Sequence, residues 1–319
     1  MQRRALLAAA LAVPAIRPAA AQAALPVVAS FSILGDLVRQ VAGGRPLALD
    51  VLVGADGDAH DFQPRPSDAA RLRGAAVLVR NGLGFDDWMG RLTSAAGFRG
   101  GAVIASEGVP FRAAEGEGHD HRGHSHGSGD RRRRSQAAEP GRAPDPHGWG
   151  NPRHAQIYVR NIAAGLSAAD PGNAALYARN AEAYSARLTA LDDEVRAAVG
   201  AVPEAKRKVI TSHDAFGYFG DAYGIAFLAP QGVNTHSEPS AAEVAALIRQ
   251  VRREGISAVF VENMTATATL DRLAREAGMR VRGRLYSDAL SGPDGPAPNY
   301  EALIRHNTGL LVPAMRGEG

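Results

Sequence analysis

The amino-acid sequence predicts an α/β protein of two lobes, each a mostly parallel β-sheet flanked by helices, joined by one long rigid helix. Two patterns predict this fold. Strand-like apolar segments alternate with helix-like segments in both halves of the chain, which is typical of parallel sheets covered by helices. Between the halves, apolar side chains recur every three or four residues, as on one stripe of a helix.

The first half supplies the elements of one lobe. Its expected strands and helices, in chain order, are residues 25–32 (strand), 33–43 (helix), 47–54 (strand), 67–74 (helix), 75–82 (strand), 85–97 (helix) and 101–106 (strand). From about residue 112 to residue 143 the pattern gives way to glycine, histidine, arginine, aspartate and proline. Because no apolar face survives there, we expect a disordered insertion.

The long helix is the most regular segment of the chain. Pro171 suits its first turn and Gly200 its end. About 28 residues at 1.5 Å each give a helix of about 40 Å, long enough to run along both lobes. Its apolar stripe consists of Tyr177, Ala181, Tyr184, Leu188, Leu191, Val195 and Val199.

The second half repeats the alternation. Its expected elements are residues 207–212 (strand), 215–224 (helix), 225–230 (strand), 240–255 (helix), 256–262 (strand), 269–278 (helix), 280–287 (strand) and 299–315 (helix). We therefore divide the chain into an N-terminal lobe (24–170), a linking helix (171–200) and a C-terminal lobe (201–319). A single larger doubly wound domain is the alternative, and the place of the long helix argues against it.

Residues 1–23 have the features of an export signal. Arg3 and Arg4 precede an apolar run that ends in Ala-Gln-Ala at 21–23, the small-x-small pattern of a signal-peptidase site. The run is short and broken by Pro14, which disfavours a retained transmembrane helix. We expect cleavage after Ala23 and a periplasmic protein that does not itself span the membrane. The arginine pair leaves open whether export is general or twin-arginine dependent.

The composition narrows the class of protein. The chain has no cysteine, so we expect no lipid-modified N-terminal cysteine and a free protein in a Gram-negative periplasm. The formal charge of +3 includes three arginines of the signal segment, so the mature chain is near neutral. A near-neutral chain lacks the excess positive charge that nucleic-acid binding requires, so we expect no nucleic-acid partner.

The histidines are the residues best suited to chemistry, because imidazole is a common ligand of zinc, copper and nickel. His60, His147 and His213 follow expected strands or lie where ordered sequence resumes, and open α/β sheets bind ligands at the carboxyl ends of their strands. Surface or helix-end packing explains the remaining histidines outside the insertion better, and these are His154, His236 and His306.

Several motifs occur in an order that resembles one family. They are "DAHDFQPRPSD" (58–68), "PDPHGWGNP" (144–152), "ITSHDAFGYF" (210–219), "SEPSAAEV" (237–244) and "YSDALSGPDGPAPNYEALIRHNT" (286–308). The chain resembles the metal-specific periplasmic solute-binding proteins of zinc and manganese ABC importers, the cluster A-I family, over essentially the whole mature chain. The resemblance implies a metal held in the cleft between the lobes and a membrane permease as partner.

Residue by residue, the resemblance implies His60 and His147 as ligands from the first lobe, and His213 and Asp288 from the second. Without the resemblance, the N-cap of a short helix would be the favoured role of Asp288. Ala59 stands where some zinc members carry a glutamate that reaches the metal, which makes Asp288 the stronger fourth candidate.

The donor set favours zinc. Three imidazoles and one carboxylate suit tetrahedral Zn(II), whereas manganese prefers more oxygen. The resemblance agrees, because zinc members carry histidine at the position of His213, where manganese members often carry glutamate. We predict Zn(II) as the transported ligand, with Mn(II) or iron as the alternative. Glu238 and Glu262 are candidates for orienting the imidazoles, although a solvated or capping role fits them equally well.

The insertion contains a second group of histidines on a glycine-rich backbone. Ordering such a backbone costs about 1 kcal/mol or more per residue, which disfavours a rigid, selective site. The resemblance points the same way, because zinc members typically carry a histidine-rich insertion here. We expect accessory, weak zinc binding, with a dispensable surface tract as the alternative, by His119, His121, His124 and His126.

Two other functions remain open. A three-histidine zinc site with a free position could activate water, as hydrolases do, but no general base is evident. A protein carboxylate in the fourth position would close such a site. An adhesin role fits poorly, because the chain lacks a cysteine anchor. We predict a monomeric binding protein that is not an enzyme.

Overall fold

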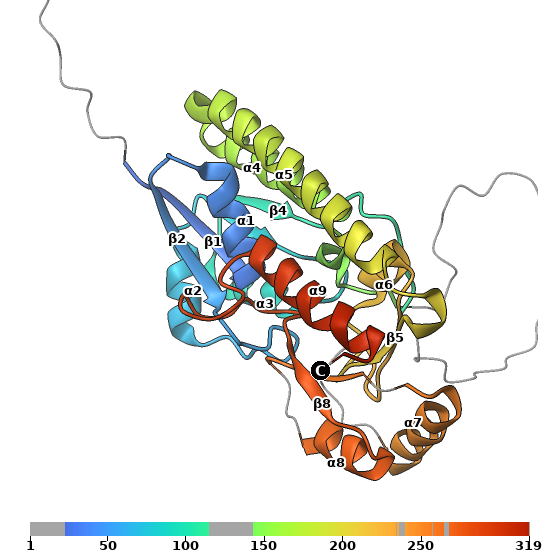
Figure 1. Ribbon diagram of the computed structural model, residues 1–319. Helices are drawn as coiled ribbons and strands as arrows, with labels where there is room; N and C mark the ends of the chain where they lie inside the picture. The colour runs from blue at the N-terminus through green and yellow to red at the C-terminus, as the bar shows by residue number, and fades with distance from the viewer. Residues whose placement is uncertain are drawn as a thin grey trace, which may run out of the picture.

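The computed structural model describes residues 23–114, 143–233, 235, 240–256, 258–264 and 268–318. It confirms the expected α/β fold of two parallel sheets flanked by helices, with one long helix running alongside (Figure 1). The expected signal segment, except for Ala23, lies outside the described residues. So do the four histidines of the insertion, His236 and Glu238, and what we expect of them stays a prediction.

The N-terminal lobe consists of β1 (Leu25–Phe31), α1 (Ser32–Ala42), β2 (Leu47–Val53), α2 (Pro66–Arg73), β3 (Val77–Arg80), α3 (Trp88–Ala96), β4 (Gly101–Ile104), the 3-10 turn η1 (Gly148–Gly150) and α4 (Pro152–Ala169). Its strands are parallel in the order β2-β1-β3-β4. Ala29 of the inner strand pairs with Val51 on one side and Val79 on the other. Helices cover the sheet, which explains why β1 and β3 are nearly continuous apolar runs.

The C-terminal lobe repeats this arrangement with η3 (Glu204–Lys206), β5 (Lys208–Ile210), α6 (Gly217–Tyr223), β6 (Ala226–Leu228), α7 (Ala241–Glu254), β7 (Val259–Glu262), α8 (Ala268–Ala277), β8 (Val281–Leu285) and α9 (Tyr300–Arg316). Its strands are parallel in the order β6-β5-β7-β8. In both sheets the first strand lies inside, and the chain continues to one side of it and then to the other. Such a reversal opens a crevice at the carboxyl ends of the strands.

The long helix begins with a 3-10 turn, η2 (Pro171–Asn173), and continues as α5 (Ala174–Gly200) for 27 residues. Every member of its expected apolar stripe is buried. The helix packs on α4 and α1 of the first lobe and on α6 and α9 of the second, and Figure 1 shows it lying along α4. Helix α5 therefore packs against both lobes.

The lobes share one apolar core, in which Phe31, Leu188 and Tyr300 all belong to the same buried cluster. Polar contacts add to it, since Leu290 donates its backbone N–H to Oγ of Ser32 at 2.9 Å. A large apolar interface restricts the relative motion of domains. In the described ranges, no helix combines the length and the apolar character needed to cross a membrane.

Candidate metal centre

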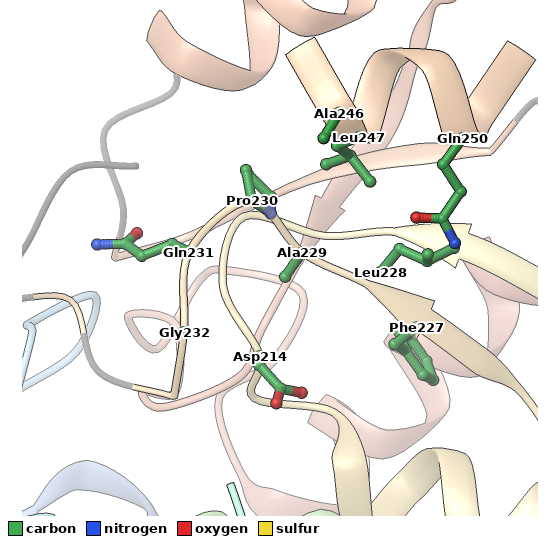
Figure 2. Close-up of a pocket in the computed structure, with 10 residues that line it drawn as sticks. All are labelled: Asp214, Phe227, Leu228, Ala229, Pro230, Gln231, Gly232, Ala246, Leu247 and Gln250. Atoms are coloured by element: carbon green, nitrogen blue, oxygen red, sulfur yellow. The ribbon is translucent and has the colours of Figure 1, made fainter. Parts of the chain in front are cut away.

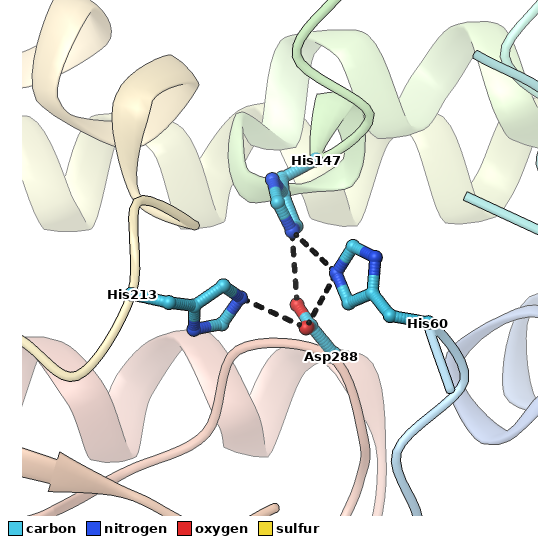
Figure 3. A group of neighbouring side chains, drawn as sticks. All are labelled: His60, His147, His213 and Asp288. Atoms are coloured by element: carbon cyan, nitrogen blue, oxygen red, sulfur yellow. Dashed lines mark hydrogen bonds and ion pairs between the residues drawn. The ribbon is translucent and has the colours of Figure 1, made fainter. Parts of the chain in front are cut away.

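Four side chains predicted as ligands meet between the lobes (Figure 3). One donor atom from each of His60, His147, His213 and Asp288 lies within 4.8 Å of all the others, and all four residues are buried. Nε2 of His60 lies 3.2 Å from Nε2 of His147 and 3.2 Å from Oδ2 of Asp288. Nε2 of His213 lies 3.1 Å from Oδ2 of Asp288, and Nε2 of His147 lies 3.5 Å from Oδ1.

His60 comes from the loop that follows β2. Oδ1 of Asp58 accepts the backbone N–H of His60 at 2.8 Å, a local turn that sets the direction of the residue. The Nε1–H of Trp88 donates to the carbonyl of Ala59 at 2.9 Å. The imidazole then packs edge-on against Phe85, with 4.5 Å between ring centroids. The ring of His60 thus packs within the first lobe, while Thr235 of the second lobe donates its hydroxyl to Oδ2 of Asp58 at 2.6 Å.

His147 is oriented by Asp145, two residues earlier. Oδ1 of Asp145 accepts both the backbone N–H of His147 at 2.9 Å and the ring Nδ1–H at 2.8 Å. Both side chains are fully buried. Metal-binding histidines commonly donate their second ring nitrogen to a carboxylate in this way. The pair therefore directs Nε2 of His147 into the centre of the group.

His213 follows β5 and is oriented by Glu262, the last residue of β7. Nδ1 of His213 lies 2.8 Å from Oε2 of Glu262. Oε1 of the same carboxylate accepts the backbone N–H groups of Ser212 at 2.8 Å and of His213 at 3.0 Å. Glu262 is buried, which excludes the solvated role that the sequence left open for it.

Asp288 lies in the loop after β8, where the described backbone forms bends rather than a helix, so it caps no helix. Next to it, the carbonyl of Ser287 accepts the indole N–H of Trp149 from the other lobe at 2.9 Å. Its Oδ1 accepts no hydrogen bond from any residue that the structure describes, although the atom is buried. A buried carboxylate oxygen without a donor is costly unless a cation satisfies it.

The charges of the group are strongly coupled. Burial lowers the pKa of His147, but the Asp288 and Asp145 carboxylates outweigh it and raise the pKa to about 9. Burial also lowers the pKa of His213, and Glu262 and Asp288 raise it well above the ordinary value. For His60, burial dominates and lowers the pKa. Burial raises the pKa of Asp288, but the facing imidazoles hold it well below its usual range.

The site can exchange protons for a cation. When His147 and His213 are neutral, their Nδ1–H groups face Asp145 and Glu262, so each Nε2 presents a lone pair. These lone pairs then face the oxygens of Asp288, which also only accept. A positive charge must lie between them, either as protons on the rings or as a bound metal ion. The donor set and its geometry therefore fit a metal ion.

Of the histidines assigned to packing, the two that the structure describes lie elsewhere. His154 lies in the first turn of α4 with its ring against Tyr218, and Nε2 of His306 on α9 contacts the carbonyl of Arg284 at 3.0 Å. Asp145 was not predicted from the sequence. The Asp-x-His spacing in "PDPHG" was the available signal, because a carboxylate two residues before a histidine can reach both its backbone and its ring.

A separate pocket of about 390 Å³ lies beside the His213 loop (Figure 2). The backbone N–H of Asp214 donates to the carbonyl of Gln231 at 3.1 Å, which joins the pocket wall to the loop. Among the described residues that line it there is no histidine, so the metal centre is distinct from it. The lining consists of Asp214, Phe227, Leu228, Ala229, Pro230, Gln231, Gly232, Ala246, Leu247 and Gln250.

Comparisons with known proteins identify the class of molecule. The family described as "Zinc-uptake complex component A periplasmic" (ZnuA) matches residues 27–314. The manganese-binding lipoprotein MntA of Halalkalibacterium halodurans is 27% identical, over 91% of this chain and 88% of its own length. The iron ABC transporter substrate-binding lipoprotein MtsA of Streptococcus pyogenes serotype M1 is 28% identical, over 89% of this chain and 86% of its own length.

Solved structures agree with the fold. The periplasmic zinc-binding protein TroA from Treponema pallidum superposes with a TM-score of 0.80 at 26% identity, covering 92% of this chain and 99% of TroA. The names of these three relatives give three different metals, manganese, iron and zinc. The comparisons therefore establish a metal-binding solute-binding protein and leave the metal itself open.

Proposed function

Because the chain belongs to the ZnuA family of metal-binding, substrate-binding components of ABC importers, we propose that it captures Zn(II) and delivers it to a membrane permease. The proposal assigns His60, His147, His213 and Asp288 as the ligands. It also places the protein in the periplasm as a monomer, with the signal segment removed.

One observation carries the choice of zinc: three imidazole Nε2 atoms and a single carboxylate converge in a buried site. Nitrogen-rich sets of four ligands suit tetrahedral Zn(II). The affinity of such ligands for divalent metals rises from manganese through iron towards the later metals, and zinc lies well above manganese. A manganese or iron cargo would call for further oxygen ligands. It is the second candidate, since MntA and MtsA are named for those metals.

The position of Asp288 favours transport over hydrolysis. Its carboxylate lies within 3.5 Å of Nε2 of all three histidines, where a catalytic zinc would keep water. A site closed by a protein carboxylate holds its cargo without activating a nucleophile.

Different residues contribute to the capture of the ion and to its release. Asp145 and Glu262 hold the rings of His147 and His213, so little side-chain freedom remains to be lost when the ion binds. Binding displaces the protons that these rings carry in the metal-free protein. Because the lobes share a core, release requires local movement of the loops that carry His60 and Asp288 rather than a wide separation of the lobes.

The histidine-rich insertion keeps an accessory role in this proposal. His119, His121, His124 and His126 would bind zinc weakly and in several arrangements, whereas the buried site binds it tightly. The proposal thus assigns two classes of zinc site to one chain, and they differ in affinity.

The test is a calorimetric titration of Zn(II), Mn(II) and Fe(II) into metal-stripped residues 24–319. We expect one tight zinc site that His213→Ala abolishes and that deletion of residues 115–136 leaves intact. His306→Ala is the matched control and should leave the tight site unchanged. Loss of tight binding on deletion, with tight binding retained in His213→Ala, would refute the ligand assignment. Tighter binding of manganese or iron than of zinc would refute the choice of metal.

A further inference from the structure

Residues 110–114 and 143–146, which we call the stem, pair with each other and include both ends of the expected insertion (about 112–143). The backbone N–H of Ala114 donates to the carbonyl of Ala143 at 2.9 Å, and that of Asp145 donates to the carbonyl of Arg112 at 2.8 Å. This pairing places Arg112 directly beside Asp145, the residue that orients His147.

The side chain of Arg112 bridges two carboxylates. Its Nη1–H donates to Oδ2 of Asp145 at 2.9 Å, and its Nε–H donates to Oδ2 of Asp221 on α6 at 3.0 Å. Asp145 is fully buried and Asp221 is exposed, so the first contact is much less screened by solvent than the second. Arg112 therefore joins the stem of the first lobe to a helix of the second.

A glycine at the start of α6 leaves room for the side chain of Arg112. A Cβ at Gly217, the first residue of α6, would lie 2.1 Å from Nη1 of Arg112, so any larger residue would displace the guanidinium. One residue on, the hydroxyl of Tyr218 donates to the carbonyl of Pro110 at 3.0 Å and accepts the backbone N–H of Arg112 at 3.2 Å. The two contacts hold the stem on α6 at Arg112 itself and two residues before it.

We propose that Arg112 is a positioning residue for the metal ligand His147, acting through Asp145 and held in place by α6 of the C-terminal lobe. Oδ1 of Asp145 is engaged by His147, and Oδ2 by Arg112. Both oxygens have to be held for the carboxylate plane, and hence the imidazole, to keep one orientation. The orientation of a ligand from the first lobe thereby depends on the docking of a helix from the second. The inference rests on the proposed function, because it requires His147 to be a ligand.

The experiment measures Zn(II) affinity by competition with a chromophoric chelator, dissociation by stopped flow, and the visible absorption of the Co(II)-substituted protein. Arg112→Ala should weaken zinc binding, by less than the about 10- to 100-fold that is typical when a direct partner of a ligand is removed, because Asp145 itself remains. The change should come mainly from faster dissociation, and the Co(II) bands should shift. Arg112→Lys should restore part of the affinity, because one ammonium reaches one carboxylate but cannot bridge two.

Two further variants separate positioning from general damage. Gly217→Ala displaces the guanidinium without changing any charge, and it should weaken zinc binding in the same direction as Arg112→Ala. Arg305→Ala is the matched control, since Arg305 also bridges two carboxylates, Glu194 and Glu301, away from the site. It should leave zinc affinity and the Co(II) spectrum unchanged. The metal-free forms are compared by thermal unfolding to verify that each variant folds.

The outcomes are distinguishable. If zinc affinity and the Co(II) spectrum of Arg112→Ala match the wild type, Arg112 is not a positioning residue, while the proposed function stands. If His213→Ala also keeps tight binding, the proposed site itself is wrong, and the inference fails with it. If Gly217→Ala binds zinc as tightly as the wild type, α6 does not hold the arginine.

Discussion

Glu262 and His213 form a buried pair in which Oε2 of the glutamate lies 2.8 Å from Nδ1 of the imidazole. They lie 49 residues apart and meet because β5 and β7 are neighbours in the sheet. The same carboxylate accepts two backbone N–H groups of the loop that carries the ligand. One side chain therefore holds the backbone of His213 and forms an ion-pair contact with its ring.

Replacing Glu262 with glutamine should weaken zinc binding about 10- to 100-fold. Glutamine has one oxygen and one NH₂ group where glutamate has two acceptors. Either the NH₂ group faces the backbone donors, or it faces Nδ1 and forces the proton onto Nε2, which removes the lone pair from the metal. Competitive chelator titration measures the loss. Glu254→Gln is the control, because Glu254 forms a partly exposed ion pair with Lys208 in the same lobe. Equal affinity of both variants would show that Glu262 does not orient His213.

Replacing Asp288 with asparagine should destabilise the metal-free protein as well as remove tight zinc binding. The carboxylate faces imidazoles whose positive charge it neutralises, and His147 has a pKa of about 9 in its presence. Removing one partner of a buried ion pair costs about 3–5 kcal/mol, and here the low end applies because the rings can lose their protons. Urea unfolding at pH 7 without metal measures the change. Asp50→Asn, which breaks an exposed pair with Arg71, should cost less than about 1 kcal/mol.

Periodicity was sufficient to predict the fold. The stripe from Tyr177 to Val199 is buried as expected, because burial of an apolar face is what stabilises a long helix. The same helix also buries Asp192, which no pattern predicted. Its carboxylate accepts hydrogen bonds from Arg153 at 2.7 Å and Tyr223 at 2.9 Å, and both belong to other helices. Only tertiary structure brings such partners together.

The metal site, too, could be predicted only in part. The four proposed ligands could be named from motifs, since each lies in a recognisable short sequence. Their mutual distances could not be predicted, because these depend on how two sheets face each other. The role of Arg112 could not be predicted from the sequence, for a further reason. It lies at the edge of a segment without an apolar pattern, and its role arises from pairing with Asp145 across the insertion.

Zinc affinity should rise with pH. Burial lowers the pKa of His147, but Asp288 and Asp145 raise it to about 9, above the ordinary 6.5. This imidazolium stabilises the metal-free fold fully below about pH 6.5, and the contribution is lost as pH rises through about 9. Because the metal needs the deprotonated ring, affinity should increase about tenfold per pH unit in that interval for this proton. Calorimetry in buffers of different ionisation enthalpy counts the protons released. A pH-independent affinity without proton release would show that the rings are already neutral in the metal-free protein.

Replacing Leu188 with alanine should lower stability without changing zinc affinity. Leu188 is fully buried in the core that both lobes share, and truncating such a leucine costs about 2–5 kcal/mol. The ligands belong to loops rather than to α5, three of them after β2, β5 and β8 and His147 directly before η1, so their geometry should persist. Because the buried cluster that contains Leu188 spans both lobes, we expect them still to unfold in one transition, at lower temperature, with saturating zinc raising the midpoint as in the wild type. Differential scanning calorimetry with and without zinc tests this, with the exposed Arg179→Ala as control. Two separate transitions in Leu188→Ala, with only one responding to zinc, would mean that the lobes are stable independently and that α5 does not couple them.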